Sequence, residues 1–227
     1  SDLSRTVKAY FALKLAGQPP EAPHMRRARA NILSKGGAAK ANVFTRILLA
    51  LFGQCPWKGV PAMPVELALL PRAFLYEISY WSRTTLMPLL IIFAKRPLKR
   101  IPTEKGIREL YVTPPEEVAE WFEWDKRWTS RRNVFLGLDR LLRAYDAHPL
   151  KGVRVKALKK AEAWILERMK GSGGLGAIYP AMANSVWALV ALGYPTDHPV
   201  VAKALREIDE LMVEDDDSLH LQPCFSP

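Results

Sequence analysis

Residues 183–195, Ala183-Asn-Ser-Val-Trp-Ala-Leu-Val-Ala-Leu-Gly-Tyr-Pro195, decide how this chain folds. An apolar run ends where Gly193 can take the left-handed conformation after a helix and Pro195 cannot continue it. The same arrangement occurs in residues 44–56, where an apolar run ends at Gly53 and Pro56, and in residues 3–19. Each of these stretches predicts an apolar helix with a defined end.

A second type of helix is basic on the outside and carries a single apolar stripe. This pattern occurs in residues 24–33, 153–170 and 198–213, and Asp197 is expected to cap the last of these helices. Amphipathic helices therefore alternate with more apolar ones. This alternation predicts an all-α fold of αα-hairpin repeats, in which each unit buries its stripe by stacking on its neighbours.

The middle of the chain is less regular. Residues 55–71 hold four prolines and predict a loop with short helices, while residues 79–94 predict an apolar helix that Pro88 should kink. Residues 96–115 are basic and interrupted by prolines, which predicts a surface loop. The spacing of Trp121, Trp124 and Trp128 places them on one helical face, and no segment shows the alternation that predicts a strand.

Composition restricts the function classes. The chain has 227 residues, of which 49% are hydrophobic and 25% charged, so disordered and collagen-like classes are excluded. The net charge of +10 favours an anionic partner such as a phospholipid surface or nucleic acid. Two cysteines, Cys55 and Cys224, form no disulfide framework and indicate a reducing compartment. The longest apolar run, residues 84–94, rises about 16 Å as a helix and is too short to span a bilayer.

Both ends of the sequence predict a piece of a longer polypeptide. The chain opens with Ser-Asp rather than Met, shows no signal-peptide pattern, and stops at Gln222-Pro-Cys-Phe-Ser-Pro227.

Motifs of common enzyme classes are missing from the sequence. It contains no P-loop, GxGxxG, HExxH or paired CxxC, and its four histidines are scattered, so we expect no metal and no cofactor. The acidic run 214–217 follows a helix end and is interpreted as a solvated loop rather than a catalytic cluster. Residues 171–176 are rich in glycine but follow a helix and lack the Lys-Ser/Thr ending of a Walker loop, which predicts a flexible turn between helices.

Aromatic residues give a more useful signal. Six of them lie on or beside the apolar helices: Phe44, Tyr80, Trp81, Phe93, Tyr179 and Trp187. Core packing explains such residues in most helical proteins. The functional alternative is an aromatic-lined cavity, because aromatic faces stabilise a carbocation without offering a nucleophile that would trap it.

The segment 131–146 predicts a basic amphipathic helix. Its apolar side comprises Val134, Phe135, Leu138, Leu141, Leu142 and Tyr145, with Leu136 beside them, and arginines lie off that stripe. Such a helix can lie in a membrane interface with its cations near lipid phosphates, or it can pack as an outer helix of the bundle.

Six blocks occur in the same order over nearly the whole chain as in one enzyme family. They are residues 6–17 (Thr-Val-Lys-Ala-Tyr-Phe-Ala-Leu-Lys-Leu-Ala-Gly), 43–53, 56–64, 79–83 (Ser-Tyr-Trp-Ser-Arg), 173–185 and 222–227. In these blocks the chain resembles the squalene-hopene cyclases, which are class II triterpene cyclases. Any single block would be a weak signal, but six collinear blocks are specific.

The resemblance implies a fold and an activity. The family folds as two (α/α) barrels, one inserted into the other, with an apolar cavity between them. Residues 1–213 resemble the inserted barrel, and residues 214–227 an acidic loop and the start of the return to a main barrel, so the chain would be about a third of a cyclase. The family binds the cytoplasmic face of the membrane as monotopic proteins, takes squalene from the bilayer, protonates it with an Asp-x-Asp-Asp motif, and forms hopene or hopanol without a cofactor.

Individual residues match family positions. Phe44 and Trp81 match cavity aromatics, and Ile78 and Leu86 match the substrate-channel segment. The run Ile178, Tyr179 and Pro180 matches a loop at the far end of the cavity, where the final cation loses a proton or meets water. The helix 131–146 matches the membrane-contacting helix, which favours the interface alternative.

The chain departs from the family pattern at several positions. The acidic motif would lie beyond Pro227, and the run 214–217 precedes the 222–227 block and is not that motif. Met169 and Leu175 stand where the family repeat usually has Gln and Trp, and residues 72–75 resemble a shortened channel segment. We therefore expect the isolated chain to be inactive, with squalene or a similar polyprenoid, membrane lipid and the rest of a cyclase as partners. A non-catalytic αα-repeat module that binds isoprenoid lipid or protein is the alternative; nucleic acid is not expected as a partner.

Overall fold

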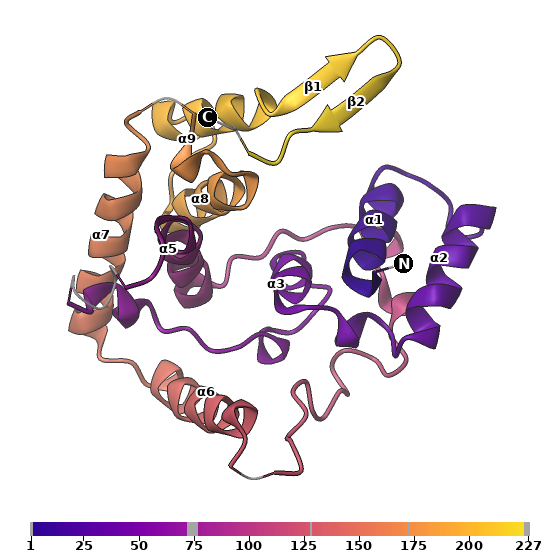
Figure 1. The fold of residues 1–227 in the computed structure, drawn as a ribbon, viewed down its shortest axis with the longest axis horizontal. Coiled ribbons are helices and arrows are strands. Elements are labelled where there is room, and N and C mark those ends of the chain that lie inside the picture. Colours follow the sequence, from indigo (N-terminus) through magenta and orange to yellow (C-terminus); the bar gives the residue numbers. More distant parts are fainter. Residues whose placement is uncertain (1, 72–76, 128, 172, 225–227) are drawn as a thin grey trace. The chain divides into compact units, whose positions relative to one another are not determined.

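The computed structural model describes residues 2–71, 77–127, 129–171 and 173–224. Helices dominate this part of the chain, which confirms the all-α prediction (Figure 1). The chain divides into two compact units, one formed by Ser1–Pro61 with Leu98–Arg140 and the other by Ala62–Pro97 with Leu141–Pro227. The predicted boundary after residue 213 stays a prediction. The shortened segment 72–75 and Trp128 lie outside the described residues.

The first unit contains α-helices, short 3-10 turns and the start of a helix that it shares with the second unit. Its elements are α1 (Leu3–Leu15), α2 (Pro23–Ser34), η1 (Ala38–Lys40), α3 (Val43–Leu51), η2 (Trp57–Gly59), η4 (Thr103–Lys105) and η5 (Arg108–Leu110). Side chains fix two helix starts: Asp2 accepts from the Arg5 amide at 2.8 Å, and Asn42 accepts from the Thr45 amide at 2.9 Å. Buried residues of α1 and α3, such as Phe11 and Leu49, form its core.

The segment predicted as a surface loop contributes to that core. Ile107 and Leu110 are fully buried, although prolines and basic residues surround them in sequence. The Gln54 side chain accepts from the Ile107 amide at 2.9 Å, and Lys14 forms an ion pair with Glu109. The prediction of a surface loop was wrong for residues 107–110, because two apolar side chains suffice to anchor an irregular segment.

The spacing of the tryptophans suggested a helical face, but residues 121–127 form no helix. Trp121 packs its ring against Gly59, where an added Cβ would lie 2.6 Å from the indole. Trp124 instead lies under the Arg140 guanidinium, 4.7 Å from the ring centroid. Tertiary contacts, rather than helical periodicity, place these two rings.

The second unit contains the longest apolar helix of the chain. Its elements are η3 (Val65–Leu69), α5 (Tyr80–Lys95), α7 (Lys151–Arg168), η6 (Leu175–Ala177), α8 (Tyr179–Leu192), α9 (Pro199–Asp209), β1 (Met212–Asp215) and β2 (Ser218–Leu221). Helix α6 (Arg131–Ala147) contributes residues to both units. Helix α5 packs along α8 and against α7, and α9 packs on α8 (Figure 1). The kink expected at Pro88 stays a prediction.

The C-terminal part departs from the expectation that the chain lacks strands. Helix α9 ends at Asp209, and Met212–Asp215 pairs antiparallel with Ser218–Leu221. The acidic run 214–217 is therefore the tip of an exposed hairpin rather than a loop. Periodicity did not reveal it, because each strand has only four residues and β1 carries Glu214 and Asp215 on opposite faces. His198, not Asp197, caps α9, by accepting from the Val200 amide at 3.3 Å.

Candidate functional site

Two of the predicted substrate segments lie side by side in the second unit. Trp81 and Leu86 are on α5, and the run 178–180 is at the start of α8, which packs along α5. Figure 1 shows α5 and α8 as neighbours. The structure thus brings together residues that are almost a hundred positions apart in sequence.

A glycine turn makes this close approach possible. Gly176 has a φ of +69° and lies against Thr84 of α5, so an added Cβ would fall 2.8 Å from the Thr84 hydroxyl oxygen. Gly174 has a φ of +72° and faces Met182 in the same way, at 2.6 Å. Only glycine accepts both the left-handed backbone and the lack of space. The segment is a turn between helices, as predicted, and packing against two side chains defines its path.

The C-terminal segment pairs with the start of α8; this region, where residues 178–179 meet residues 223–224, is called the corner. The Tyr179 amide donates to the Pro223 carbonyl at 2.9 Å, and Ile178 forms an isolated antiparallel bridge with Cys224. The start of α8 has no side-chain cap, so this backbone pairing satisfies one of its free donors. Sequence reasoning placed 222–227 in the family pattern but gave no signal for this contact.

The predicted site residues differ in exposure. The side chains of Trp81 and Tyr179 are 61% and 39% exposed, Pro180 is exposed, and Ile78, Leu86 and Ile178 are half-buried. Phe44 belongs to the first unit and is 64% exposed. Phe93 is buried, which fits the core interpretation for that residue. The exposed aromatics thus present apolar surface to solvent.

Neither of the two segments contains an acid. Residues 80–95 and 175–180 hold no Asp or Glu. The Thr84 hydroxyl is fully buried and donates to the Trp81 carbonyl at 2.8 Å, so it is held away from a ligand. Within the described ranges no cluster of histidine, cysteine or acidic side chains could hold a metal. The described surface of α5 and the turn is therefore apolar and aromatic and carries no carboxylate.

Helix α6 exposes its apolar side. The side chains of Val134, Phe135, Leu138 and Leu141 are 47–69% exposed, while Leu142 and Tyr145 are half-buried. Tyr145 points its hydroxyl to Glu66, and its pKa is raised by desolvation and by that carboxylate. No helix in the described ranges combines the length and hydropathy needed to cross a bilayer.

A cluster of charged side chains fixes the C-terminal end of α6 to the second unit. Arg154 of α7 contacts Asp146 at 2.6 Å and Glu66 of η3 at 3.0 Å, and Arg96 also pairs with Asp146. Glu66, Asp146 and Arg154 expose only 13–16% of their side chains. Opposite charges alternate, so each half-buried charge has a partner.

Comparison with known proteins shows the family. The model for the N-terminal domain of squalene-hopene cyclases matches residues 1–217. This chain belongs to the squalene-hopene cyclase family. It is 47% identical to a squalene-hopene cyclase of Zymomonas mobilis and 42% identical to one of Bradyrhizobium diazoefficiens, in both cases over the whole chain. It is also 34% identical to a dammaradiene synthase of Dryopteris crassirhizoma.

The chain corresponds to only part of these cyclases. It spans 35% of the length of each of these two squalene-hopene cyclases and 33% of the dammaradiene synthase. Met169 and Leu175 are both buried in the second unit.

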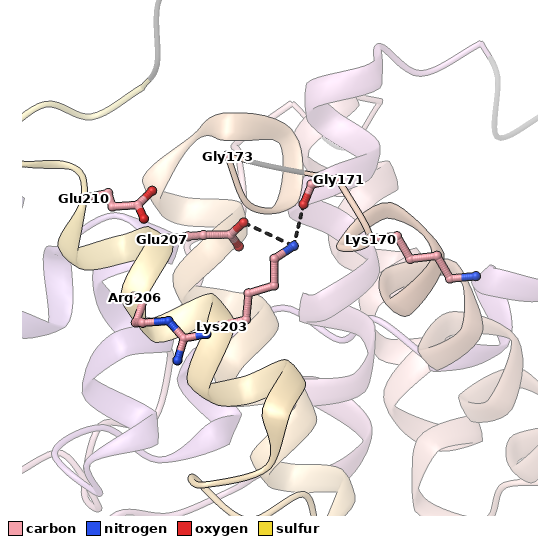
Figure 2. A pocket seen from close by; sticks show the side chains of 7 residues that line it. All are labelled: Lys170, Gly171, Gly173, Lys203, Arg206, Glu207 and Glu210. Carbon is pink, nitrogen blue, oxygen red and sulfur yellow. Dashed lines mark hydrogen bonds and ion pairs between the residues drawn. The ribbon is translucent and has the colours of Figure 1, made fainter.

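Sequence reasoning missed one polar site. A pocket of about 450 Å³ lies between α9 and the end of α7 (Figure 2). Its described lining residues are Lys170, Gly171, Gly173, Lys203, Arg206, Glu207 and Glu210. Lys203, Arg206 and Glu207 of α9 and its C-cap residue Glu210 follow an i, i+3, i+4, i+7 spacing, which predicts that they share a face. Only the structure pairs that face with the glycine turn.

Proposed function

We propose that this chain is part of a squalene-hopene cyclase and supplies cavity wall, substrate channel and membrane contact. The observation that carries the proposal is the packing of α5, the helix that carries Trp81, against α8, which begins at the 178–180 segment; residues 80–95 and 175–180 contain no Asp or Glu. The reaction is the cationic polycyclisation of squalene to hopene or hopanol. The proton donor lies on polypeptide outside this chain.

Cationic cyclisation requires a cavity wall without groups that would trap the carbocation. Protonation of a terminal alkene leaves a tertiary carbocation, and each following double bond attacks it, forming one C–C bond and moving the charge along the chain. A lone pair within reach would end this cascade early. The faces of Phe44 and Trp81 stabilise cations by about 0.5–2 kcal/mol each without donating a lone pair. The buried Thr84 hydroxyl, engaged with the Trp81 carbonyl, is withheld from the cation.

The end of the cascade is assigned to residues 178–180. There the final cation either loses a proton to give an alkene or captures water to give an alcohol. The exposed Tyr179 and Pro180 and the half-buried Ile178 would shape the space available to that water.

Helix α6 is proposed as the contact with the cytoplasmic face of the membrane. Its exposed apolar residues can enter the interface, and the exposed Arg131, Arg132 and Arg140 can meet lipid phosphates. Squalene is soluble in the hydrocarbon region of a bilayer, so a cyclase that draws on it benefits from such a contact.

A chimera tests the catalytic part of the proposal. This chain replaces the matching third of the Zymomonas mobilis squalene-hopene cyclase, and the product is incubated with squalene in detergent. Hopene from the chimera and none from the 227-residue chain alone is the expected result. Hopene from the chain alone would refute the missing-acid argument, and a folded chimera without product would favour a non-catalytic lipid-binding module.

Trp81→Leu in the chimera refines this test. Loss of the aromatic face should lower kcat more than it raises KM, because cation stabilisation acts only during the cascade. The matched control is Tyr80→Leu, its exposed neighbour on α5, which the family match leaves out of the cavity.

A further inference from the structure

Lys203 occupies a central place in the pocket between α9 and the end of α7. Figure 2 shows its ammonium group pointing to Gly171 and Glu207, whereas the ammonium group of Lys170 points away from them. Lys203 donates to the Met169 carbonyl at 2.8 Å and to the Gly171 carbonyl, and it pairs with Glu207 at 3.3 Å. An ammonium group has three hydrogens, so these three contacts use all of them and leave none for a ligand.

Glu207 forms an ion pair with Lys203. The residue is 5% exposed, and its second carboxylate oxygen is buried without a hydrogen-bond partner among the described residues. A buried carboxylate is costly unless a cation accompanies it. Glu207 therefore holds Lys203 in one place, and Lys203 neutralises Glu207.

The two carbonyls that Lys203 binds belong to residues that follow directly after α7. Met169 is the C-cap residue that follows Arg168, the last residue of α7, and Gly171 lies two residues further on. Cations near helix C-termini satisfy the free carbonyls and interact favourably with the helix dipole. The turn continues through Gly174 and Gly176, which lie against Met182 and Thr84, into the run 178–180. Lys203 is thus the polar tether at one end of the turn whose other end carries the predicted product-determining residues.

We propose that Lys203, held by Glu207, is a positioning residue that sets where Ile178, Tyr179 and Pro180 lie and so influences the product of the cyclase. The geometric part concerns this chain alone, and the product part rests on the proposed function. Removing the tether shifts the balance between proton loss and water capture by the final cation. The reacting atoms touch neither Lys203 nor Glu207.

Hydrogen exchange on the 227-residue chain tests the geometry. The amides of Tyr179, Ala181 and Met182 donate to the carbonyls of Pro223 and Ile178 and report on this corner. Lys203→Met should speed their exchange about tenfold, because a lost charge-assisted contact lowers the local opening free energy. Amides of α1 and α3 should not change. The matched control is Arg206→Met, an exposed cation that lines the same pocket.

The double variant Lys203→Met/Glu207→Leu separates stability from positioning. It removes the buried carboxylate together with its partner, so it should fold even if the single variant does not. Its exchange at Tyr179, Ala181 and Met182 should remain fast. Wild-type exchange rates in the double variant would overturn the proposal.

Product analysis in the Zymomonas mobilis chimera tests the consequence. The double variant should change the ratio of hopanol to hopene by about threefold, since a small displacement near reacting atoms alters competing steps. The conservative variant Lys203→Arg should keep a ratio close to that of the wild-type chimera. Fast exchange with an unchanged ratio would overturn the product assignment. A wild-type chimera without product would instead contradict the proposed function, whatever the exchange rates show.

Discussion

Helices α5 and α6 differ in what covers their apolar residues. In α5, Met87 to Phe93 are all buried, because α7 and α8 pack against this helix. In α6, the one buried residue among those described is Asn133, whose side chain binds backbone groups of Asp125 and Arg127. Apolar side chains of similar type are thus interior in one helix and exposed in the other.

This difference teaches that hydropathy alone does not assign a helix to the core. Burying a Leu or Phe side chain contributes about 1.5–3 kcal/mol to the free energy of folding. The exposed Leu and Phe side chains of α6 do not make this contribution within the chain. Its Leu141 and Phe135 are each more than 60% exposed. An exposed apolar stripe of this kind marks a surface that another phase or protein covers.

The largest expected effect comes from the same substitution made in both helices. Leu90→Ala in α5 should destabilise the chain by about 2–5 kcal/mol, because Leu90 is fully buried and its loss leaves a cavity. Leu141→Ala in α6 should change the free energy of unfolding by less than about 0.5 kcal/mol. Urea unfolding followed by circular dichroism measures both, and equal losses would contradict the contrast between the helices.

A second effect concerns membranes. Phe135→Ser/Leu141→Ser should reduce binding to vesicles of anionic phospholipid about thirtyfold or more, because two side chains lose their transfer from water. Co-sedimentation at 0.1 M and 1 M NaCl measures it, and binding of the wild-type chain should persist at high salt. The control is Val112→Ser, another exposed apolar residue outside α6. Unchanged binding of the double variant would remove α6 from the proposed contact.

A third effect concerns the anchor of α6. Arg154→Met should destabilise the chain by about 1–3 kcal/mol, since it leaves the half-buried Glu66 and Asp146 with fewer partners. Lys156→Met, an exposed cation two residues further along α7, is the control. If both variants unfold at the same urea concentration as the wild type, the cluster does not hold α6.

The smallest effect extends the contrast between buried and exposed side chains to the two cysteines. Burial raises the pKa of the Cys55 thiol to about 12, although Arg46 partly opposes this. Below pH 9 both folded and unfolded states keep the proton, so stability is unaffected; between about pH 9 and 12 the unfolded state loses it first and stability falls. At pH 10 this loss is about 1 kcal/mol, and Cys55→Ala should remove it.

A thiol reagent at pH 8 gives the direct measurement. It should react promptly with the half-buried Cys224 and with Cys55 only after unfolding. Prompt labelling of both thiols would show that Cys55 is accessible.

Local signals predicted much of the fold. Gly53, Gly193 and the prolines after them marked helix ends correctly, because helix termination depends on a few neighbouring residues. The hairpin β1–β2 was missed, since its pairing depends on register rather than on a run of apolar residues. Ile107 was misplaced because its segment is held by contacts with residues distant in sequence, such as the hydrogen bond from its amide to Gln54.

In the candidate site, too, some residues could be selected from the sequence, whereas their contacts could not. Trp81 and the 178–180 run could be selected from the sequence as matches to a family. Their adjacency depends on Gly176 meeting Thr84, and the role of Lys203 depends on carbonyls of another helix. Side chains that act on backbone atoms carry no sequence motif, so only coordinates could identify them.

The pairing of Tyr179 with Pro223 has a consequence for synthesis of the protein. The ribosome makes the start of α8 well before Pro223 emerges, so the Tyr179 amide has no partner while α8 and α9 are being made. This corner therefore closes late, after the hairpin has formed or as it forms. Nascent chains stalled before residue 222 should carry a helical α8 whose first turn is still frayed.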